Sequence, residues 1–131
     1  MELLICSPLD TVVQTKIEKV TFEAVDGYRT LLPKHVDFVS ALGAGIITYV
    51  PLKGTAKYVA CHQGIVVKQG DKVTISAQGT VTGDTLAELQ EHIQHDYKQN
   101  EEHRKELSAA MARLELGLAR GFQQLKGGAY D

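Results

Sequence analysis

Histidines and cysteines are the side chains of this chain whose chemistry could support catalysis or metal binding. The histidines are His35, His62, His92, His95 and His103. His92 and His95 are three residues apart, whereas zinc-binding helices usually present two histidines four residues apart with a third ligand nearby. Because no cysteine pair or matching acid accompanies them, we interpret both as solvated histidines of a helix. The sequence therefore predicts no metal site.

His35 could act as a general base, with Asp37 two residues further on to orient its ring. A nucleophilic site would also need a serine or cysteine in a recognisable elbow, and none adjoins His35. The glycines at 43, 45, 54, 64 and 70 lack the Gly-Lys-Ser/Thr ending of a phosphate loop. We expect no catalytic residue and no cofactor, and a structural or interface role for His35. A small stand-alone ligand-binding or enzymatic β domain using His35 is the alternative.

The composition is that of a globular protein. The 131 residues are 44% hydrophobic and 23% charged, with a net charge of −2 and no tryptophan. Nothing in this balance favours a nucleic acid or an anionic membrane as a partner. No apolar run approaches the roughly 18 residues of a membrane span, and no signal peptide is expected. Cys6 and Cys61 lie in strand-like runs, which predicts reduced, buried thiols in a cytosolic protein.

Residues 1–82 have the pattern of an all-β sandwich or flattened barrel. Short runs rich in Val, Ile, Thr and Tyr recur, separated by Gly, Pro and Asp. Residues 19–24 alternate polar and apolar side chains, as in a half-buried strand. The expected strands are residues 2–6, 11–15, 19–25, 29–33, 37–42, 45–50, 56–62, 64–69 and 72–77.

Residues 84–126 have a helical pattern, which makes the fold class α+β. Asp84 is the expected N-cap, and large side chains then recur in steps of three and four. This stripe fails between 99 and 104, where Asn100 resembles a new N-cap, so we expect a two-helix hairpin rather than one helix of roughly 60 Å. The stripe is either a packing face or a partner-binding surface. Residues 127–131 are an expected disordered end. The stripe contains Leu86, Leu89, Ile93, Tyr97, Leu107, Met111, Leu114, Leu118, Phe122 and Leu125.

Three stretches carry a family likeness. LLPKHVDFVSALGAGI at 31–46, QGIVVKQGDKVTISA at 63–77 and the opening ELLICSP followed by Asp10 resemble the epsilon subunit of F-type ATP synthases. In that family Leu-Pro-x-His precedes an apolar run, a glycine and a strand. The sandwich-plus-hairpin plan is similar over essentially the whole chain. The segment LPKHVDFV at 32–39 resembles an alternate, sodium-translocating branch of these ATPases more closely than the other members.

The resemblance implies a rotor part without an active site. The chain would sit in the central stalk, couple the gamma subunit to the c ring during ion-driven ATP synthesis, and bind gamma through a flank of the sandwich. It would be peripheral, on the cytoplasmic face of the bacterial inner membrane. By position, a loop of Asp26, Gly27, Tyr28, Arg29 and Thr30 would meet the c ring, with Leu31, Pro33 and His35 shaping and bracing it.

The resemblance also implies a tail that restrains ATP hydrolysis by reaching gamma and the alpha/beta hexamer. Its candidate contacts are Arg113, Leu114, Leu118, Arg120 and Phe122. Two departures from the family pattern matter. Thr30 replaces a usual glycine, so the loop shape is expected to differ. Some bacterial members bind ATP through Leu-Asp-x-x-Arg-Ala, but here Ala87 and Gln90 occupy the Asp and Arg places, so nucleotide sensing is not expected.

Overall fold

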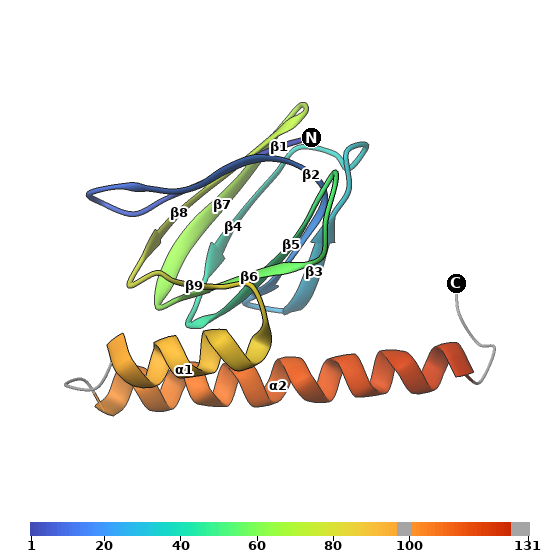
Figure 1. The fold of residues 1–131 in the computed structure, drawn as a ribbon. Helices are drawn as coiled ribbons and strands as arrows, with labels where there is room; N and C mark the ends of the chain where they lie inside the picture. The colour runs from blue at the N-terminus through green and yellow to red at the C-terminus, as the bar shows by residue number, and fades with distance from the viewer. Residues whose placement is uncertain (97–100, 127–131) are drawn as a thin grey trace.

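The computed structural model describes residues 1–96 and 101–126, and side-chain environments for residues 1–95 and 101–117. The described residues form nine strands followed by two helices (Figure 1). This confirms the predicted fold class. The elements are β1 Glu2–Cys6, β2 Thr11–Ala24, β3 Gly27–Leu31, β4 Phe38–Leu42, β5 Gly45–Pro51, β6 Lys57–Cys61, β7 Gln63–Gln69, β8 Lys72–Gln78, β9 Val81–Gly83, α1 Leu86–Asp96 and α2 Glu101–Lys126.

The strands close into a flattened barrel in the order β1-β8-β7-β4-β2-β5-β6-β9, with β3 on β2 and an extra β1–β2 pairing. β2 belongs to both layers, because its first half pairs with β1 and its second half with β3 and β5. Alternate side chains of every layer point inward and fill the core. The largest buried ones include Leu3, Ile5, Ile17, Val20, Phe22, Leu31 and Ile75.

Two strand predictions were wrong in detail. The runs 11–15 and 19–25 form one strand, β2, in which the pairing register with β5 shifts between Ile17 and Lys19. Such an irregularity bends a strand without ending it. The short strand β9 was missed, because three residues are too few to show an alternating pattern.

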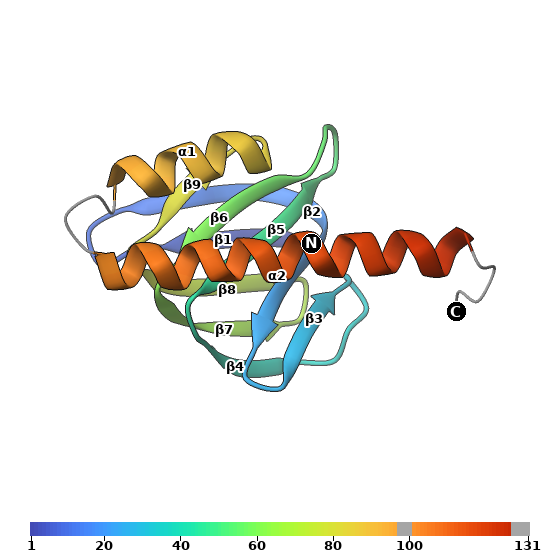
Figure 2. The same cartoon turned by 90° about the horizontal axis from the view of Figure 1, so that it is seen from below.

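The two helices pack side by side on the outer face of β5, β6 and β9 (Figure 2). Their apolar stripe is therefore used for packing as far as the described side chains extend. The residues of this second buried cluster are Ile46, Ala60, Val81, Leu89, Ile93, Leu107, Ala110, Met111 and Leu114. Neither helix, within the described part of the chain, is both long and apolar enough to cross a bilayer.

The helix boundaries differ from the expected ones. Residues 101–104 are helical, although the break was expected to reach 104. Asn100, Tyr97 and residues 127–131 lie outside the described residues. Thr85 caps α1 in place of Asp84, because its hydroxyl accepts the Glu88 N–H at 3.0 Å and its carbonyl accepts the Leu89 N–H at 2.9 Å. Asp84 instead pairs with Lys57 Nζ at 3.0 Å.

The two cysteines differ in environment. Both are free thiols, as expected. Cys61 is buried, and this burial raises the pKa of its thiol to about 11. Cys6 is only partly buried, contrary to the prediction, because it stands at an outward-facing position of β1.

Candidate functional site

The stretch expected to meet the c ring is mostly strand. Only Val25 and Asp26 form a turn, and residues 27–31 are β3, paired with β2 from Ala24↔Gly27 to Val20↔Leu31. Gly27 has φ +124°, a conformation that residues with a side chain rarely adopt. The expected loop of residues 26–30 is therefore wrong, because the chain reverses in two residues and pairs again at once.

The β2–β3 hairpin carries charged, polar and aromatic side chains that contact one another or neighbouring strands. Arg29 Nη2 lies 2.5 Å from Asp26 Oδ2, and this contact lowers the pKa of the Asp26 carboxyl. The Arg29 guanidinium lies 5.9 Å from the centre of the Phe38 ring. Thr30 shares a hydroxyl–hydroxyl hydrogen bond of 2.9 Å with Thr21. Partial burial raises the pKa of Tyr28, and the negative charge of Glu23 adds to this effect.

Pro33 and His35 lie at the other end of β3. Five residues of strand span about 17 Å, so these residues do not brace the hairpin turn as expected. Pro33 is the second residue of a turn that is closed by the His35 N–H donating to the Leu32 carbonyl at 2.9 Å. Leu31 is buried in the core and anchors this end of the strand.

Lys68 is the residue that holds the Pro33–His35 turn, and sequence reasoning missed it. Its side chain is 2% exposed, and Nζ donates to the carbonyls of Pro33 at 3.3 Å, His35 at 2.7 Å and Gly70 at 2.6 Å. The sequence does contain a signal for its burial. Lys68 is two residues after Val66 in β7, so both side chains point to the same, inward side of the strand.

The geometry gives no support to a base at His35. Its Nδ1 bonds the Val36 carbonyl at 2.8 Å, and its ring packs edge-on against Phe38 at 5.8 Å. Asp37 does not orient this ring, because its Oδ1 accepts the Gly70 N–H at 2.9 Å. His35 lines neither the groove beside Gln63 and Gln78 nor the cavity beside Glu2 and Lys72. Among the described residues, no group of three His, Cys, Asp or Glu side chains could hold a metal ion.

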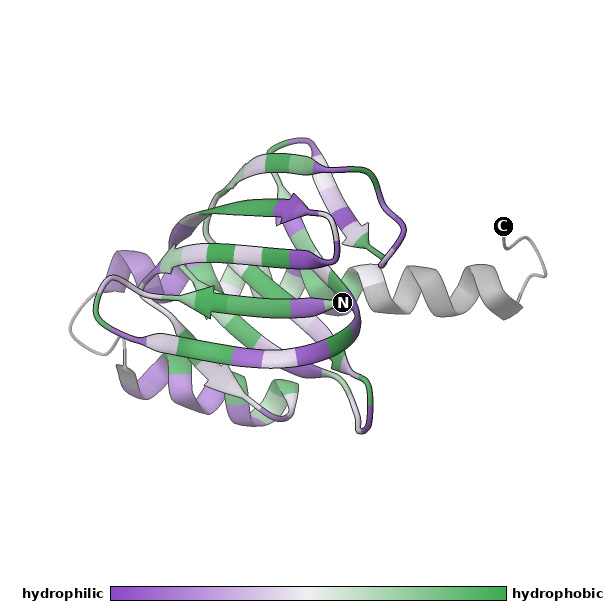
Figure 3. Ribbon diagram, turned by 90° about the horizontal axis from the view of Figure 1, so that it is seen from above, coloured by the Kyte–Doolittle hydropathy of each residue, from purple (hydrophilic) through white to green (hydrophobic). Residues whose placement is uncertain are grey.

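The outer face of β1, β8, β7 and β4 is left uncovered by the helices, and hydrophobic residues alternate with hydrophilic ones along its strands (Figure 3). Cross-strand pairing places Ala41, Ile65, Ser76 and Cys6 in one row across the four strands. Val39 and Ile65 are large apolar side chains exposed on this face. The residues of this uncovered face therefore form a candidate contact surface.

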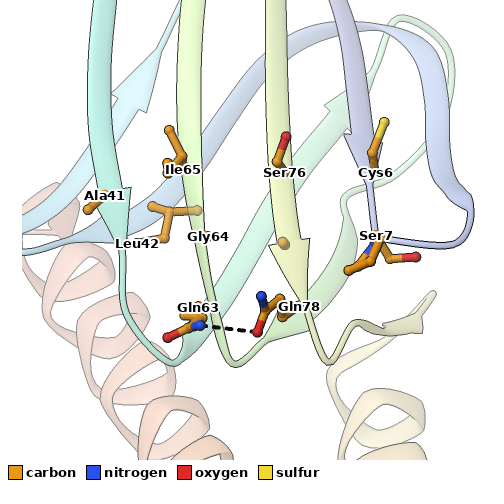
Figure 4. A pocket seen from close by; sticks show the side chains of 11 residues that line it. Cys6, Ser7, Ala41, Leu42, Gln63, Gly64, Ile65, Ser76 and Gln78 are labelled. Carbon is orange, nitrogen blue, oxygen red and sulfur yellow. Dashed lines mark hydrogen bonds between the residues drawn. The ribbon is translucent and has the colours of Figure 1, made fainter.

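A groove of about 550 Å³ lies at one end of this uncovered face (Figure 4). Gln63 and Gln78 close it with a side-chain hydrogen bond of 3.1 Å. Gly64 lets β7 approach β8 closely, because a Cβ there would lie 2.4 Å from the Ser76 carbonyl oxygen. The groove is lined by Cys6, Ser7, Pro8, Ala41, Leu42, Gln63, Gly64, Ile65, Ser76, Ala77 and Gln78.

Two of the tail candidates, Arg113 and Leu114, have described side chains, and both contact other parts of this chain. The Arg113 guanidinium forms a two-pronged ion pair with Glu23, with Nε–Oε2 and Nη2–Oε1 both at 3.0 Å, which raises the pKa of Arg113. Leu114 is buried in the cluster between the helices and the sandwich. The environments of Leu118, Arg120 and Phe122 lie outside the described side chains.

Histidines also contribute to the helix–sandwich contact. His92 is not simply solvated as expected, because its Nδ1 bonds the Thr82 carbonyl at 2.7 Å. The rings of His62 and His103 lie 3.8 Å apart, and His62 Nε2 lies 3.4 Å from Glu106 Oε2. These contacts join α1 and α2 to the edge of the sandwich.

Comparisons with known proteins agree with this architecture. Residues 1–83 match the family model described as the β-sandwich domain of the ATP synthase delta/epsilon chain. The ATP synthase epsilon chain of Sulfurovum sp. is 27% identical over 119 residues, covering 88% of this chain and 93% of that protein. The epsilon chain of Campylobacter hominis is 32% identical over 80 residues, covering 60% of this chain and 62% of the relative. The match therefore spans less than two thirds of the Campylobacter protein.

Two solved structures share the fold. One is the mitochondrial ATP synthase of Euglena gracilis, with OSCP, F1 and c-ring, at a TM-score of 0.62 and 18% identity, covering 88% of this chain and 79% of the matched chain. The other is the central stalk and c-ring of the Tetrahymena thermophila mitochondrial ATP synthase, at a TM-score of 0.57 and 13% identity, covering 84% and 96%. At these identities the likeness concerns the fold alone.

Proposed function

Because this chain belongs to the ATP synthase delta/epsilon chain family, we propose that it is a non-catalytic rotor subunit that couples the gamma stalk to the c ring. The observation that carries the proposal is the family match over residues 1–83, which contains both the β2–β3 hairpin and the uncovered face. The similar fold in the Tetrahymena central stalk and c-ring supports it. The chain would then be a peripheral part of the complex, on the cytoplasmic face of the bacterial inner membrane.

The uncovered face of β1, β8, β7 and β4 is our proposed gamma-binding surface. The helices cover the outer face of β5, β6 and β9, so this is the sandwich flank left for a partner. Exposed apolar side chains on this face, such as Val39 and Ile65, adjoin polar ones such as Gln63 and Gln78. Apolar side chains bordered by polar ones are typical of a protein–protein interface.

The β2–β3 hairpin is our proposed contact with the c ring. Asp26, Gly27, Tyr28, Arg29 and Thr30 stay candidates, and the exposed Val25 at the turn joins them. A two-residue turn fixed by Gly27 and by the Asp26–Arg29 pair loses little conformational freedom on docking. Leu31, Pro33 and His35 would act from the far end of β3, where Leu32 and Val36 expose apolar side chains.

We further propose that the tail restrains ATP hydrolysis when it leaves the sandwich and contacts gamma and the alpha/beta hexamer. Arg113 and Leu114 would then have to exchange their present contacts with Glu23 and the buried cluster. The block at residues 32–39 supports a further proposal, that the complex belongs to the sodium-translocating branch. Ion pumping measured with and without Na⁺ in the assembled complex tests that assignment.

Co-purification with gamma tests the rotor assignment. Ile65 on the proposed gamma surface and Leu52 after β5 are both 52% exposed, so they form a matched pair. We expect Ile65→Arg to weaken gamma binding at least tenfold, because a charge is buried without a partner, and Leu52→Arg to leave it unchanged. Wild-type chain that fails to co-purify with gamma would overturn the rotor proposal. Binding by both variants would overturn only the surface assignment.

A further inference from the structure

We propose that the Glu23–Arg113 ion pair is a latch that makes the docked α2 and the β2–β3 hairpin one conformational unit. Release of α2 would then loosen the hairpin, and displacement of the hairpin would loosen α2. The latch would regulate the hairpin surface that we propose contacts the c ring. Only this regulatory role rests on the proposed function.

The latch joins two elements that are far apart in the sequence. Glu23 lies in β2, directly opposite Tyr28 of β3, and Arg113 lies in the middle of α2. Three donor–acceptor distances between the two side chains are 3.0, 3.0 and 3.3 Å. Such a two-pronged arginine–carboxylate pair fixes orientation as well as distance.

The sandwich is shaped to hold the carboxylate of this latch. Gly45 of β5 lies beneath Glu23, and a Cβ at Gly45 would be 3.5 Å from Glu23 Oε1 and 3.6 Å from Glu23 Cβ. The Glu23 side chain, only 22% exposed, therefore rests on bare backbone and is presented to α2. Arg113 is 48% exposed, so water reaches the pair from the helix side.

Tyr28 carries the contact from the latch into the hairpin. Gly117, one helical turn after Arg113, has its Cβ position 4.0 Å from Tyr28 Cε2. The pKa of Tyr28 is raised overall, first by burial and then by the negative charge of Glu23, while the positive charge of Arg113 acts in the opposite direction. Both members of the ion pair therefore interact electrostatically with the Tyr28 hydroxyl. The turn of α2 from 113 to 117 thus lies over the cross-strand pair Glu23–Tyr28.

Among the described residues, the other attachments of α2 lie mostly on the N-terminal side of the latch. Its apolar contacts run from Leu107 to Leu114, and Glu106 meets His62 at the turn between β6 and β7. Without the latch, these contacts would keep the first part of α2 docked. The turn of α2 beside the hairpin would open first. By thermodynamic linkage, opening of this turn would destabilise the β2–β3 hairpin, and opening of the hairpin would destabilise the turn.

Amide hydrogen exchange on the full chain tests the latch. We expect both Glu23→Gln and Arg113→Gln to speed exchange about fivefold or more, in β3 and in residues 112–117 of α2 together. The double reversal Glu23→Arg with Arg113→Glu should restore slow exchange in both. Because the pair is partly exposed, 1 M salt should speed exchange in the wild-type chain and shrink its difference from the single variants.

The matched control is Arg104→Gln, which removes another ion-paired arginine of α2. Arg104 pairs with Glu101 in its own helix and donates to Gln94 of α1, and neither partner lies in the hairpin, so hairpin exchange should not change. Faster exchange in α2 with an unchanged hairpin, or a double reversal that restores neither element, would overturn the latch. These measurements use the chain alone, so their failure leaves the rotor proposal standing. Conversely, loss of gamma binding would leave the latch standing.

Discussion

Lys68 shows how a buried charge can serve as a structural centre. Its ammonium has three N–H donors, and three backbone carbonyls accept them. The carbonyls belong to the turn at Pro33 and His35 and to the turn between β7 and β8. Two turns far apart in the sequence are therefore joined at one atom.

Replacing Lys68 with methionine keeps most of the volume and removes the donors. We expect Lys68→Met to lower the free energy of unfolding by about 1–3 kcal/mol, because three carbonyls lose their donor, an effect partly offset by removal of a buried charge. The measurement is urea unfolding. Lys72→Met, at an exposed position of the same hairpin, is the control and should stay within about 0.5 kcal/mol. Equal unfolding midpoints would show that the ammonium is not needed.

Secondary structure could be predicted from the sequence wherever a pattern extended over several residues. The strands with alternating side chains and the two amphipathic helices are examples. The errors were local: β9 was too short to show a pattern, and Thr85 competed with Asp84 for the cap. The sequence analysis also missed the inward-facing Lys68 of β7, because two of its three carbonyl partners, Pro33 and His35, are more than 30 residues away in the sequence.

Close packing of α1 on β9 depends on Gly83. A Cβ at this position would lie 2.7 Å from the Leu89 backbone nitrogen and 2.8 Å from Leu89 Cβ. We expect Gly83→Ala to destabilise the chain by about 1–3 kcal/mol, since α1 would have to shift.

Gly43→Ala is the matched control, because a Cβ there meets nothing within 4 Å, and it should change stability by no more than about 0.5 kcal/mol. Thermal unfolding of both variants makes the comparison. A Gly83→Ala chain as stable as the control would mean that the helix moves aside freely.

The arrangement of the candidate site belongs to the whole molecule and could not be predicted from the sequence. Residues 26–35 are contiguous in the sequence, yet Asp26 and His35 lie beyond opposite ends of the strand β3. The pairing of Glu23 with Arg113 spans 90 residues. Such contacts depend on which strands become neighbours, and no local pattern encodes that choice.

Removing the tail tests its role in the assembled enzyme. A chain ending at Gly83 should raise ATP hydrolysis while ion pumping per ATP is kept, because the proposed restraint on rotation is gone. The same truncation uncovers Ile46, Ala60 and Val81, so the isolated chain should unfold at lower urea concentration. Deletion of residues 127–131 alone is the control. Unchanged hydrolysis after the full truncation would show that the tail is not an inhibitor.

The parallel pairing of β1 with β8 sets the order in which the barrel can be completed during synthesis. Residues 7–71 separate the two strands, so β1 can pair with β2 early but must wait for β8 to pair on its other side. At about 5–20 residues per second, the ribosome needs roughly 3–13 seconds to supply them. During that interval β1 is an open strand edge on the nascent chain, available to any other unpaired strand.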